Sequence, residues 1–258
     1  MSLIMLQVEH LTKIYADGTV ALRDVNFTVE EGEFLIIIGL SGSGKSTLLR
    51  CINRLVEPTE GRILWNGRDV TTANQSELRL IRREIGMIFQ HFNLVKRSSV
   101  LTNVLSGRLG YTPPAWSLAN RFRRADRERA DRALQRVGIP DKARNRADEL
   151  SGGQQQRVGI ARALMQDPKM ILADEPVASL DPVLAHSILG YLEKINREDN
   201  VTILCSLHFL DLVQRYATKV IGLREGRLVF EGDSEDIRRM SDERFREIYG
   251  EEAERLGA

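Results

Sequence analysis

Hydrophobic and polar residues alternate along much of the N-terminal third of the chain, which is the pattern of half-buried β-strands. In VNFTV, Val25, Phe27 and Val29 share one face, and residues 6–15 alternate in the same way. Residues 34–38 (FLIII) are apolar throughout, as in a strand that is buried on both faces. Further strands are predicted at GRILWNGRDV, which contains an Asn-Gly turn, and at IGMIFQ.

The pattern becomes helical after residue 90 and then changes to an alternation of buried strands and helices. Residues 91–150 read as mostly helical, with a Pro-rich loop (YTPPAWSLANRF) and a charged stretch (RFRRADRERADR). Strands are then predicted at KMILAD, VTILCS, KVIGL and RLVFE, with a helix over residues 183–197 between the first two. This alternation predicts an α/β protein with a mostly parallel sheet and helices on its faces. The last twenty or so residues are charged and read as helical.

The composition is that of an ordinary globular chain. Of its 258 residues, 42% are hydrophobic and 28% are charged. The net charge of +1 does not favour nucleic acid as a partner. No apolar run approaches the roughly 18 residues of a membrane span and the signal-peptide pattern is missing, so a cytoplasmic location is expected. Cys51 and Cys205 form no metal-binding or disulfide pattern and are expected to be buried, reduced thiols.

Residues 39–47 (GLSGSGKST) follow the buried strand, open a predicted helix and match the phosphate-loop pattern G-x-x-x-x-G-K-[ST]. Glycines allow backbone N–H groups to wrap a phosphate. Lys45 is expected to reach the β- and γ-phosphates, and the Ser46 hydroxyl is expected to ligate Mg²⁺. The predicted phosphate-binding residues are Gly39, Ser41, Gly42, Ser43, Gly44, Lys45, Ser46 and Thr47.

Residues 170–176 (MILADEP) supply carboxylates at the end of a predicted strand. Asp174 can hold the Mg²⁺ shell. Glu175, one residue further on, can activate water as a general base. With the phosphate loop, this motif predicts a Mg²⁺-dependent nucleoside triphosphatase.

A second candidate anion site lies at LSGGQ, residues 150–154. A Ser and two glycines open an amphipathic helix with Val158, Ala161 and Leu164 at apolar spacing. Free backbone N–H groups and the helix dipole favour a negative charge at such a point. One domain therefore carries two predicted anion sites.

The phosphate loop, LSGGQ and ILADEP, in this order, resemble the ATP-binding-cassette (ABC) ATPases, and the resemblance covers the whole chain. It implies a P-loop NTPase (RecA-like) α/β fold with an N-terminal antiparallel β subdomain and an inserted α-helical subdomain. One domain, residues 1–258, is expected. Its nucleotide-binding core and antiparallel β subdomain would span residues 1–90 and 164–258, and its helical subdomain with the signature motif would span residues 91–163.

The resemblance also implies roles for single residues. Tyr15 would stack on adenine, Gln90 would sense Mg²⁺ and couple to a membrane subunit, and His208 would contact the γ-phosphate. The ASLD segment, residues 178–181, would touch an opposite subunit. His10, His91 and His186 receive no role.

Two subunits face each other head to tail in the family the chain resembles. Ser151, Gly152, Gly153 and Gln154 of one copy would then close on the γ-phosphate held by the phosphate loop of the other, which explains the second anion site. ATP and Mg²⁺ are the implied cofactors. The implied catalytic residues are Glu175, His208, Lys45 and Gln90, and the implied metal ligands are Ser46, Gln90 and Asp174.

A single cassette without membrane spans resembles the importer ATPases more than the exporters. Two segments are similar to the phosphonate-importer ATPases, namely FNLVKRSSVLTNVLSGRLGYTPPAWS and ALMQDPKMILADEPVASLDP. Phe209 is a departure, because Gln is common at this position in that subfamily. Importers of phosphite or phosphate-like oxyanions, or of polar amino acids, are the alternatives. A soluble cassette acting on nucleic acid or ribosomes is an alternative of a different class, and the near-neutral charge argues against it.

The implied partners are a second copy of the chain, integral membrane permease subunits and, indirectly, a substrate-binding protein, with no nucleic acid. The implied location is peripheral, on the cytoplasmic face of the cell (inner) membrane. Phe92, Leu94 and Val95 would lie near the groove that receives a permease helix, and core packing is an equally weighted alternative. For RFRRADRERADR, a solvated helix is the default, and contact with anionic lipid headgroups is the alternative.

Overall fold

The computed structural model describes residues 3–118, 121–233, 235–236, 239 and 248–249. A six-stranded sheet, in the order β10-β9-β3-β8-β7-β6, forms the centre, and a four-stranded sheet, β2-β1-β4-β5, lies beside it. The central strands β6 to β9 and β3 pair in parallel, and β10 pairs antiparallel with β9. The strand bounds are β1 Ile4–Ile14, β2 Val20–Glu30, β3 Phe34–Ile38, β4 Glu60–Trp65, β5 Arg68–Asp69, β6 Ile85–Ile88, β7 Met170–Ala173, β8 Thr202–Ser206, β9 Lys219–Arg224 and β10 Arg227–Gly232.

The continuous apolar run of β3 is explained by two hydrophobic cores, one on each face of the central sheet. Phe34, Ile36 and Ile38 pack into the core shared with the helices on one face. Leu35 and Ile37 pack into the core shared with the four-stranded sheet on the other face. Since neighbouring side chains of a strand point to opposite faces, every residue of β3 must be apolar.

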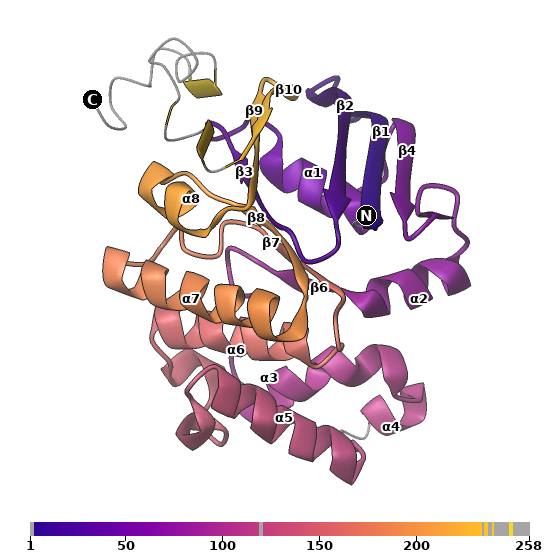
Figure 1. Ribbon diagram of the computed structural model, residues 1–258. Helices are drawn as coiled ribbons and strands as arrows, with labels where there is room; N and C mark the ends of the chain where they lie inside the picture. Colours follow the sequence, from indigo (N-terminus) through magenta and orange to yellow (C-terminus); the bar gives the residue numbers. More distant parts are fainter. Residues whose placement is uncertain (1–2, 119–120, 234, 237–238, 240–247, 250–258) are drawn as a thin grey trace.

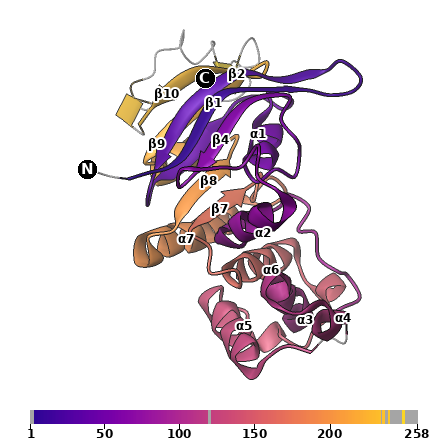
Figure 2. The same ribbon diagram turned by 90° about the vertical axis from the view of Figure 1, so that its right-hand side faces the viewer.

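The helices form layers on the sheet (Figures 1 and 2). In Figure 1, α1 lies between the two sheets, α7 and α6 lie below the central sheet, and α3, α4 and α5 form a further layer beneath them. The helix bounds are α1 Lys45–Ile52, α2 Gln75–Glu84, α3 Val100–Leu105, α4 Pro114–Leu118, α5 Arg124–Arg136, α6 Gly152–Leu164, α7 Pro182–Asp199 and α8 Leu210–Tyr216, with 3-10 turns η1 Ser106–Tyr111, η2 Pro140–Lys142 and η3 Ala147–Glu149. Among the helices described, none is both long and apolar enough to cross a lipid bilayer.

The predicted α/β fold with a mostly parallel sheet is confirmed, and so is the helix predicted near residues 183–197, which is α7. Cys51 and Cys205 are free and buried, as predicted. The interpretation of YTPPAWSLANRF as a loop is wrong in part, because Pro114–Leu118 form α4. Most of the helix predicted at the C-terminus lies outside the described residues.

Candidate functional site

The loop between β3 and α1 has a backbone that only glycine allows at two points. Gly39 and Gly44 have φ of 143° and 107°. A Cβ atom at Gly39 would lie 2.2 Å from the carbonyl oxygen of Leu223, and one at Gly44 would lie 2.5 Å from that of Ala21. Gly44 caps α1 without a side-chain hydrogen bond, and the buried Ser43 Oγ has no partner. The loop therefore has donors available for an anion at the N-terminus of α1.

Lys45 lies in this loop with its ammonium in the protein interior. The residue is 3% exposed, and Nζ donates to the carbonyl oxygens of Gly39 and Leu40, each over 2.8 Å. Burial lowers the pKa of Lys45 to about 8, although Glu175 and Asp174 favour the charged form. Nζ is 3.8 Å from Glu175 Oε1. A buried cation held by neutral carbonyls is well suited to a more negative partner such as a phosphate.

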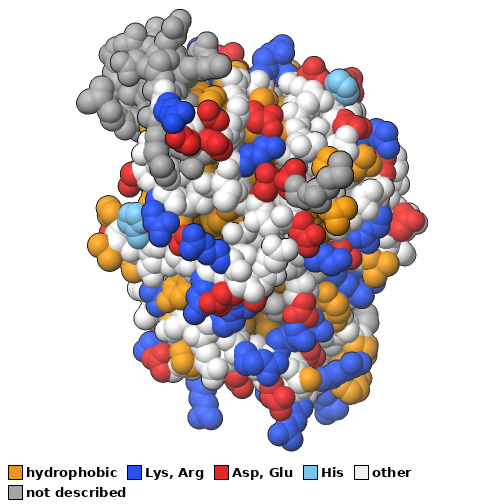
Figure 3. Space-filling view, in the orientation of Figure 1, with side chains coloured by type: hydrophobic (Ala, Val, Ile, Leu, Met, Phe, Trp, Pro, Cys, Tyr) orange, Lys and Arg blue, Asp and Glu red, His pale blue; other side chains and the backbone are white. Residues whose placement is uncertain are grey.

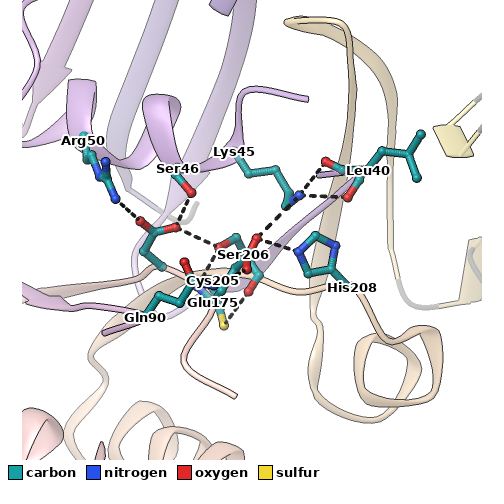
Figure 4. Close-up of polar contacts among 11 residues, drawn as sticks. Leu40, Lys45, Ser46, Arg50, Gln90, Glu175, Cys205, Ser206 and His208 are labelled. Carbon is teal, nitrogen blue, oxygen red and sulfur yellow. Dashed lines mark hydrogen bonds and ion pairs between the residues drawn. The ribbon is translucent and has the colours of Figure 1, made fainter. Parts of the chain in front are cut away.

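Asp174 follows β7 and is 1% exposed. Its Oδ1 accepts a hydrogen bond from Ser46 Oγ over 2.6 Å, and its Oδ2 accepts one from Arg50 Nη2 over 3.1 Å. Ser206 Oγ, at the end of β8, donates to Oδ1 over 3.5 Å. Neighbouring parallel strands and α1 thus bring a hydroxyl and a carboxylate together as predicted (Figure 4).

Glu175 is held by contacts from three directions. Its Oε1 is 2.5 Å from His208 Nε2, its Oε2 accepts a hydrogen bond from Gln90 Nε2 over 3.2 Å, and its N–H donates to Ser206 Oγ. The hydrogen bond with His208 is the main reason that the pKa of Glu175 lies below its usual value, and Lys45 adds to the effect. The carboxylate is therefore ionised and oriented at neutral pH, as a general base must be (Figure 4).

Tyr15 lies at the far end of the phosphate loop. Its hydroxyl is 3.3 Å from Thr47 Oγ1, and the residue is 38% exposed. Lys13 Nζ lies 5.1 Å from the centre of the ring. The ring is thus next to the phosphate loop and accessible to a planar group.

The segment LSGGQ lies at the N-terminus of α6. Ser151 caps this helix, and its side chain and that of Gln154 form a reciprocal capping box. A Cβ atom at Gly152 would lie 3.6 Å from the side chain of Leu180, in the ASLD segment, and one at Gly153 would lie 3.2 Å from that of Leu184, just after this segment. Among the contacts of the described residues, none joins 151–154 to the phosphate loop, which contacts Asp174 through Ser46 and Glu175 through Lys45 instead.

The donor set suits a magnesium ion that keeps water and phosphate ligands. Ser46 Oγ is hydrogen-bonded to Asp174, and the side chain of Gln90 is hydrogen-bonded to the neighbouring carboxylate, Glu175. The described part of the chain holds no group of three or more His, Cys, Asp or Glu side chains arranged for a metal. A single carboxylate with a hydroxyl is typical of Mg²⁺ that is bound together with a nucleotide.

Two residues of this network were not predicted. Arg50 lies four residues after Ser46 on α1, one turn along the same face, and this spacing was the available signal. Ser206, the last residue of β8, contacts both Asp174 and Glu175. Phe209, the departure noted above, is 50% exposed and leaves the contact between His208 and Glu175 in place.

A phosphate loop after a central parallel strand, with two carboxylates at the end of a nearby strand, defines a nucleotide-binding protein of the phosphate-loop class. Within this class, the family model for ABC transporters matches residues 22–178. The chain belongs to the ABC transporter family.

Similar proteins agree with this assignment. The chain is 52% identical over 246 residues to a phosphonates import ATP-binding protein of Halalkalibacterium halodurans, covering 95% of this chain and 94% of that protein. It is 53% identical over 255 residues to a phosphonates import ATP-binding protein of Staphylococcus saprophyticus, covering 98% of each. A solved dimeric ATP-binding cassette in a post-hydrolysis state, bound to ADP and Pi, has a TM-score of 0.78 at 36% identity, covering 89% of this chain and 99% of that one.

Proposed function

We propose that this chain is the ATP-hydrolysing subunit of an ABC importer that takes up phosphonate-type substrates through a separate permease. The observation that carries the hydrolytic part is the contact of Glu175 with His208, Gln90 and Lys45 beside the phosphate loop. The substrate class rests on the relatives named as phosphonate import proteins, which match nearly the whole chain.

The residues divide the work of phosphoryl transfer between them. Lys45 and the backbone N–H groups of the phosphate loop bind the β- and γ-phosphates. Glu175 accepts the proton of the attacking water, and His208 holds that carboxylate in place and contacts the γ-phosphate. Tyr15 stacks on the adenine ring. Mg²⁺ would be held by Ser46, Gln90 and Asp174 and would neutralise charge on the phosphate oxygens.

The active form that we propose is a head-to-tail dimer. In this arrangement Ser151, Gly152, Gly153 and Gln154 of one copy bind the γ-phosphate on the phosphate loop of the other. The position of Ser151, Gly152 and Gly153 at the N-terminus of α6 supports this proposal, and so does the dimeric solved cassette that the chain resembles. A monomer would then have very low activity.

The permease would bind at the helical subdomain, residues 91–163, and residues 1–90 and 164–258 would make up the nucleotide-binding core and the antiparallel β subdomain. Val95 is 63% exposed, whereas Phe92 and Leu94 are partly buried, so Val95 is the member of this group best placed for a partner. The protein would be peripheral, on the cytoplasmic face of the cell membrane, and a substrate-binding protein would deliver the substrate to the permease.

The test is reconstitution of the chain with its permease and substrate-binding protein in vesicles. ATP turnover is measured with methylphosphonate, phosphite, phosphate and polar amino acids in turn. Stimulation by methylphosphonate is the expected result. Stimulation by an amino acid alone would overturn the substrate class but leave the ATPase assignment intact.

A further inference from the structure

A basic hollow of about 240 Å³ lies between α2, η1 and the end of α6, away from the nucleotide site. It separates α2, which packs against the central sheet, from η1, which packs on α6. Its lining residues are Gln75, Arg79, Arg82, Arg83, Gly107, Gly110, Tyr111 and Gln166.

Three arginines of α2 line this hollow, and no carboxylate does. Arg79, Arg82 and Arg83 are spaced i, i+3 and i+4, so their side chains share one side of the helix, where like charges repel. Figure 3 shows Lys and Arg side chains on the right-hand side of the molecule, where acidic and hydrophobic side chains lie among them. Such a group of like charges is stabilised when an anion lies between them.

The charges of these arginines are not cancelled by the contacts they make. Arg82 donates to the carbonyl oxygens of Asn53 and Arg54, which are neutral acceptors. The guanidinium of Arg83 lies 4.7 Å from the centre of the Tyr111 ring, and its buried Nε has no hydrogen-bond partner. Burial and the nearby Arg54 lower the pKa of Arg82, although Glu57, which is itself paired with Arg54, favours the charged form.

Acidic side chains on the neighbouring segments are engaged elsewhere. Glu84 accepts hydrogen bonds from Trp65 and Arg68, and Asp167 pairs with Arg129. Glu77 belongs to the capping box of α2, where it accepts a hydrogen bond from the backbone of Asn74.

The amide group of Gln166 indicates the same ligand chemistry as the arginines. Gln166 lines the hollow, and its buried Oε1 has no hydrogen-bond partner. A rotation of this amide by 180° exchanges oxygen and nitrogen, and it would present an N–H donor at that place. The hollow can therefore offer guanidinium and amide donors together.

A second arginine-lined hollow in the same structure differs because carboxylates line it as well. The hollow of about 440 Å³ beneath α5 is lined by Arg129, Arg132 and Arg136, but also by Asp167 and Asp199. Arg129 pairs with Asp167, and Arg136 pairs with Asp199. Two of the three arginines of that hollow are thus paired with carboxylates that also line it, whereas no carboxylate lines the hollow beside α2.

We propose that the hollow beside α2 binds a small tetrahedral oxyanion of the phosphate or phosphonate class. Guanidinium forks match the geometry of such oxygens, and the volume accommodates a phosphate or a short alkyl phosphonate. Tyr111 already links the two sides, because its hydroxyl donates to the carbonyl oxygen of Gln166 and its ring stacks on Arg83. A bound oxyanion adds to this link and stabilises the contact of α2 with η1.

Isothermal titration of the full chain tests the proposal. The chain is first saturated with Mg²⁺ and a non-hydrolysable ATP analogue, so that the phosphate loop is filled and cannot bind the probe. Inorganic phosphate and methylphosphonate are then titrated at low ionic strength, where electrostatic binding is strongest. Saturable 1:1 binding is expected, and Arg79→Gln is expected to weaken it by about tenfold.

Two further variants separate binding from folding. Arg79 is exposed, so Arg79→Gln should keep the unfolding temperature of the free protein while losing the rise that phosphate gives the wild type. Arg83→Gln should also weaken binding, and Arg132→Gln, in the hollow beneath α5, should leave it unchanged.

Three results would overturn the proposal. The first is the absence of saturable binding of both anions, and the second is equal affinity in wild type and Arg79→Gln. The third is retention on phosphatidylglycerol vesicles that depends on Arg79 and that free phosphate does not displace, because the site would then serve a lipid headgroup instead of a free anion.

Discussion

Arg50 and Asp174 form an ion pair in which a surface guanidinium neutralises an interior carboxylate. Arg50 Nη2 lies 3.1 Å from Asp174 Oδ2, and the side chains are 46% and 1% exposed. The same carboxylate accepts the Ser46 hydroxyl on its other oxygen, so Arg50 competes for a group that is proposed to serve Mg²⁺. The pair therefore connects the protein surface to the proposed metal site.

Replacement of Arg50 should destabilise the protein mainly when nucleotide is absent. Arg50→Gln leaves a buried carboxylate with hydroxyl partners and a weaker neutral donor, at an expected cost of about 1–2 kcal/mol in the free energy of unfolding. Saturating Mg²⁺ and ATP should reduce this cost, because the metal supplies the positive charge. Urea unfolding with and without Mg²⁺ and ATP measures both values.

The matched control for this prediction is Arg62→Gln. Arg62 is 59% exposed and lies 3.5 Å or more from Glu9 and Asp69, so the expected loss is below about 0.5 kcal/mol. If Arg50→Gln and Arg62→Gln cost the same, and Mg²⁺ and ATP change neither, the proposed competition at Asp174 is wrong.

Replacement of Glu175 by Gln should abolish turnover and keep nucleotide binding. The amide has nearly the same shape and retains a partner in Gln90, but it cannot accept a proton from water. ATP hydrolysis should fall by about 10²–10⁴-fold, which is the usual contribution of a general base. Steady-state ATPase rates and the dissociation constant of a fluorescent ATP analogue are the measurements, and a variant with normal turnover would remove Glu175 from this role.

Lys45 should lower the stability of the nucleotide-free protein near neutral pH. Its pKa is about 8 in the folded protein, against an ordinary value of 10.5, so the unfolded chain binds more protons between these two pH values. The free energy of unfolding therefore rises as the pH increases from 8 to 10.5. Below pH 8, the full cost of burying the charged Lys45 side chain lowers this free energy. The difference amounts to about 3 kcal/mol.

The corresponding measurement compares wild type with Lys45→Met, which keeps a chain of similar length without charge. At pH 7 the variant should unfold at a higher urea concentration, and its advantage should shrink towards pH 10. ATP binding should be lost at every pH. An advantage that stays constant with pH would show that Lys45 is not the titrating group.

The sequence predicted well those features that depend on local pattern. The apolar run FLIII predicted a doubly buried strand because each residue of β3 must face one of two cores. The two motifs assigned Ser46 and Asp174 to Mg²⁺, and Lys45 and Glu175 to the phosphates and the attacking water. The structure brings these four residues together, because parallel strands end at one edge of the sheet. These arguments needed no knowledge of distant contacts.

Features that depend on tertiary contacts were missed. Helix α2 was not predicted, because it contains several charged residues and its apolar face consists of only two buried residues, Leu78 and Ile81. The capping-box pattern of Asn74 and Glu77 was the available signal. The partnership of Arg50 with Asp174 joins residues 124 positions apart, and its only local signal was the four-residue spacing of Arg50 from Ser46 on α1. The basic hollow likewise depends on how η1 packs against α2.

Ser151 gives the sharpest test of the proposed dimer, because its substitution can be made without loss of the helix cap. Ser151→Asp keeps an acceptor for the backbone N–H of Gln154, and Asp is as good an N-cap residue as Ser, so the free energy of unfolding should change by less than about 0.5 kcal/mol. The added carboxylate would repel the γ-phosphate held by the opposite copy and should abolish turnover. Binding of ATP to the isolated chain should persist, because no described contact joins Ser151 to the phosphate loop of its own chain. Ser76→Asp, at the exposed start of α2, is the control and should leave turnover unchanged. Normal ATPase activity in Ser151→Asp at protein concentrations that support wild-type turnover would contradict the proposed γ-phosphate contact across the dimer.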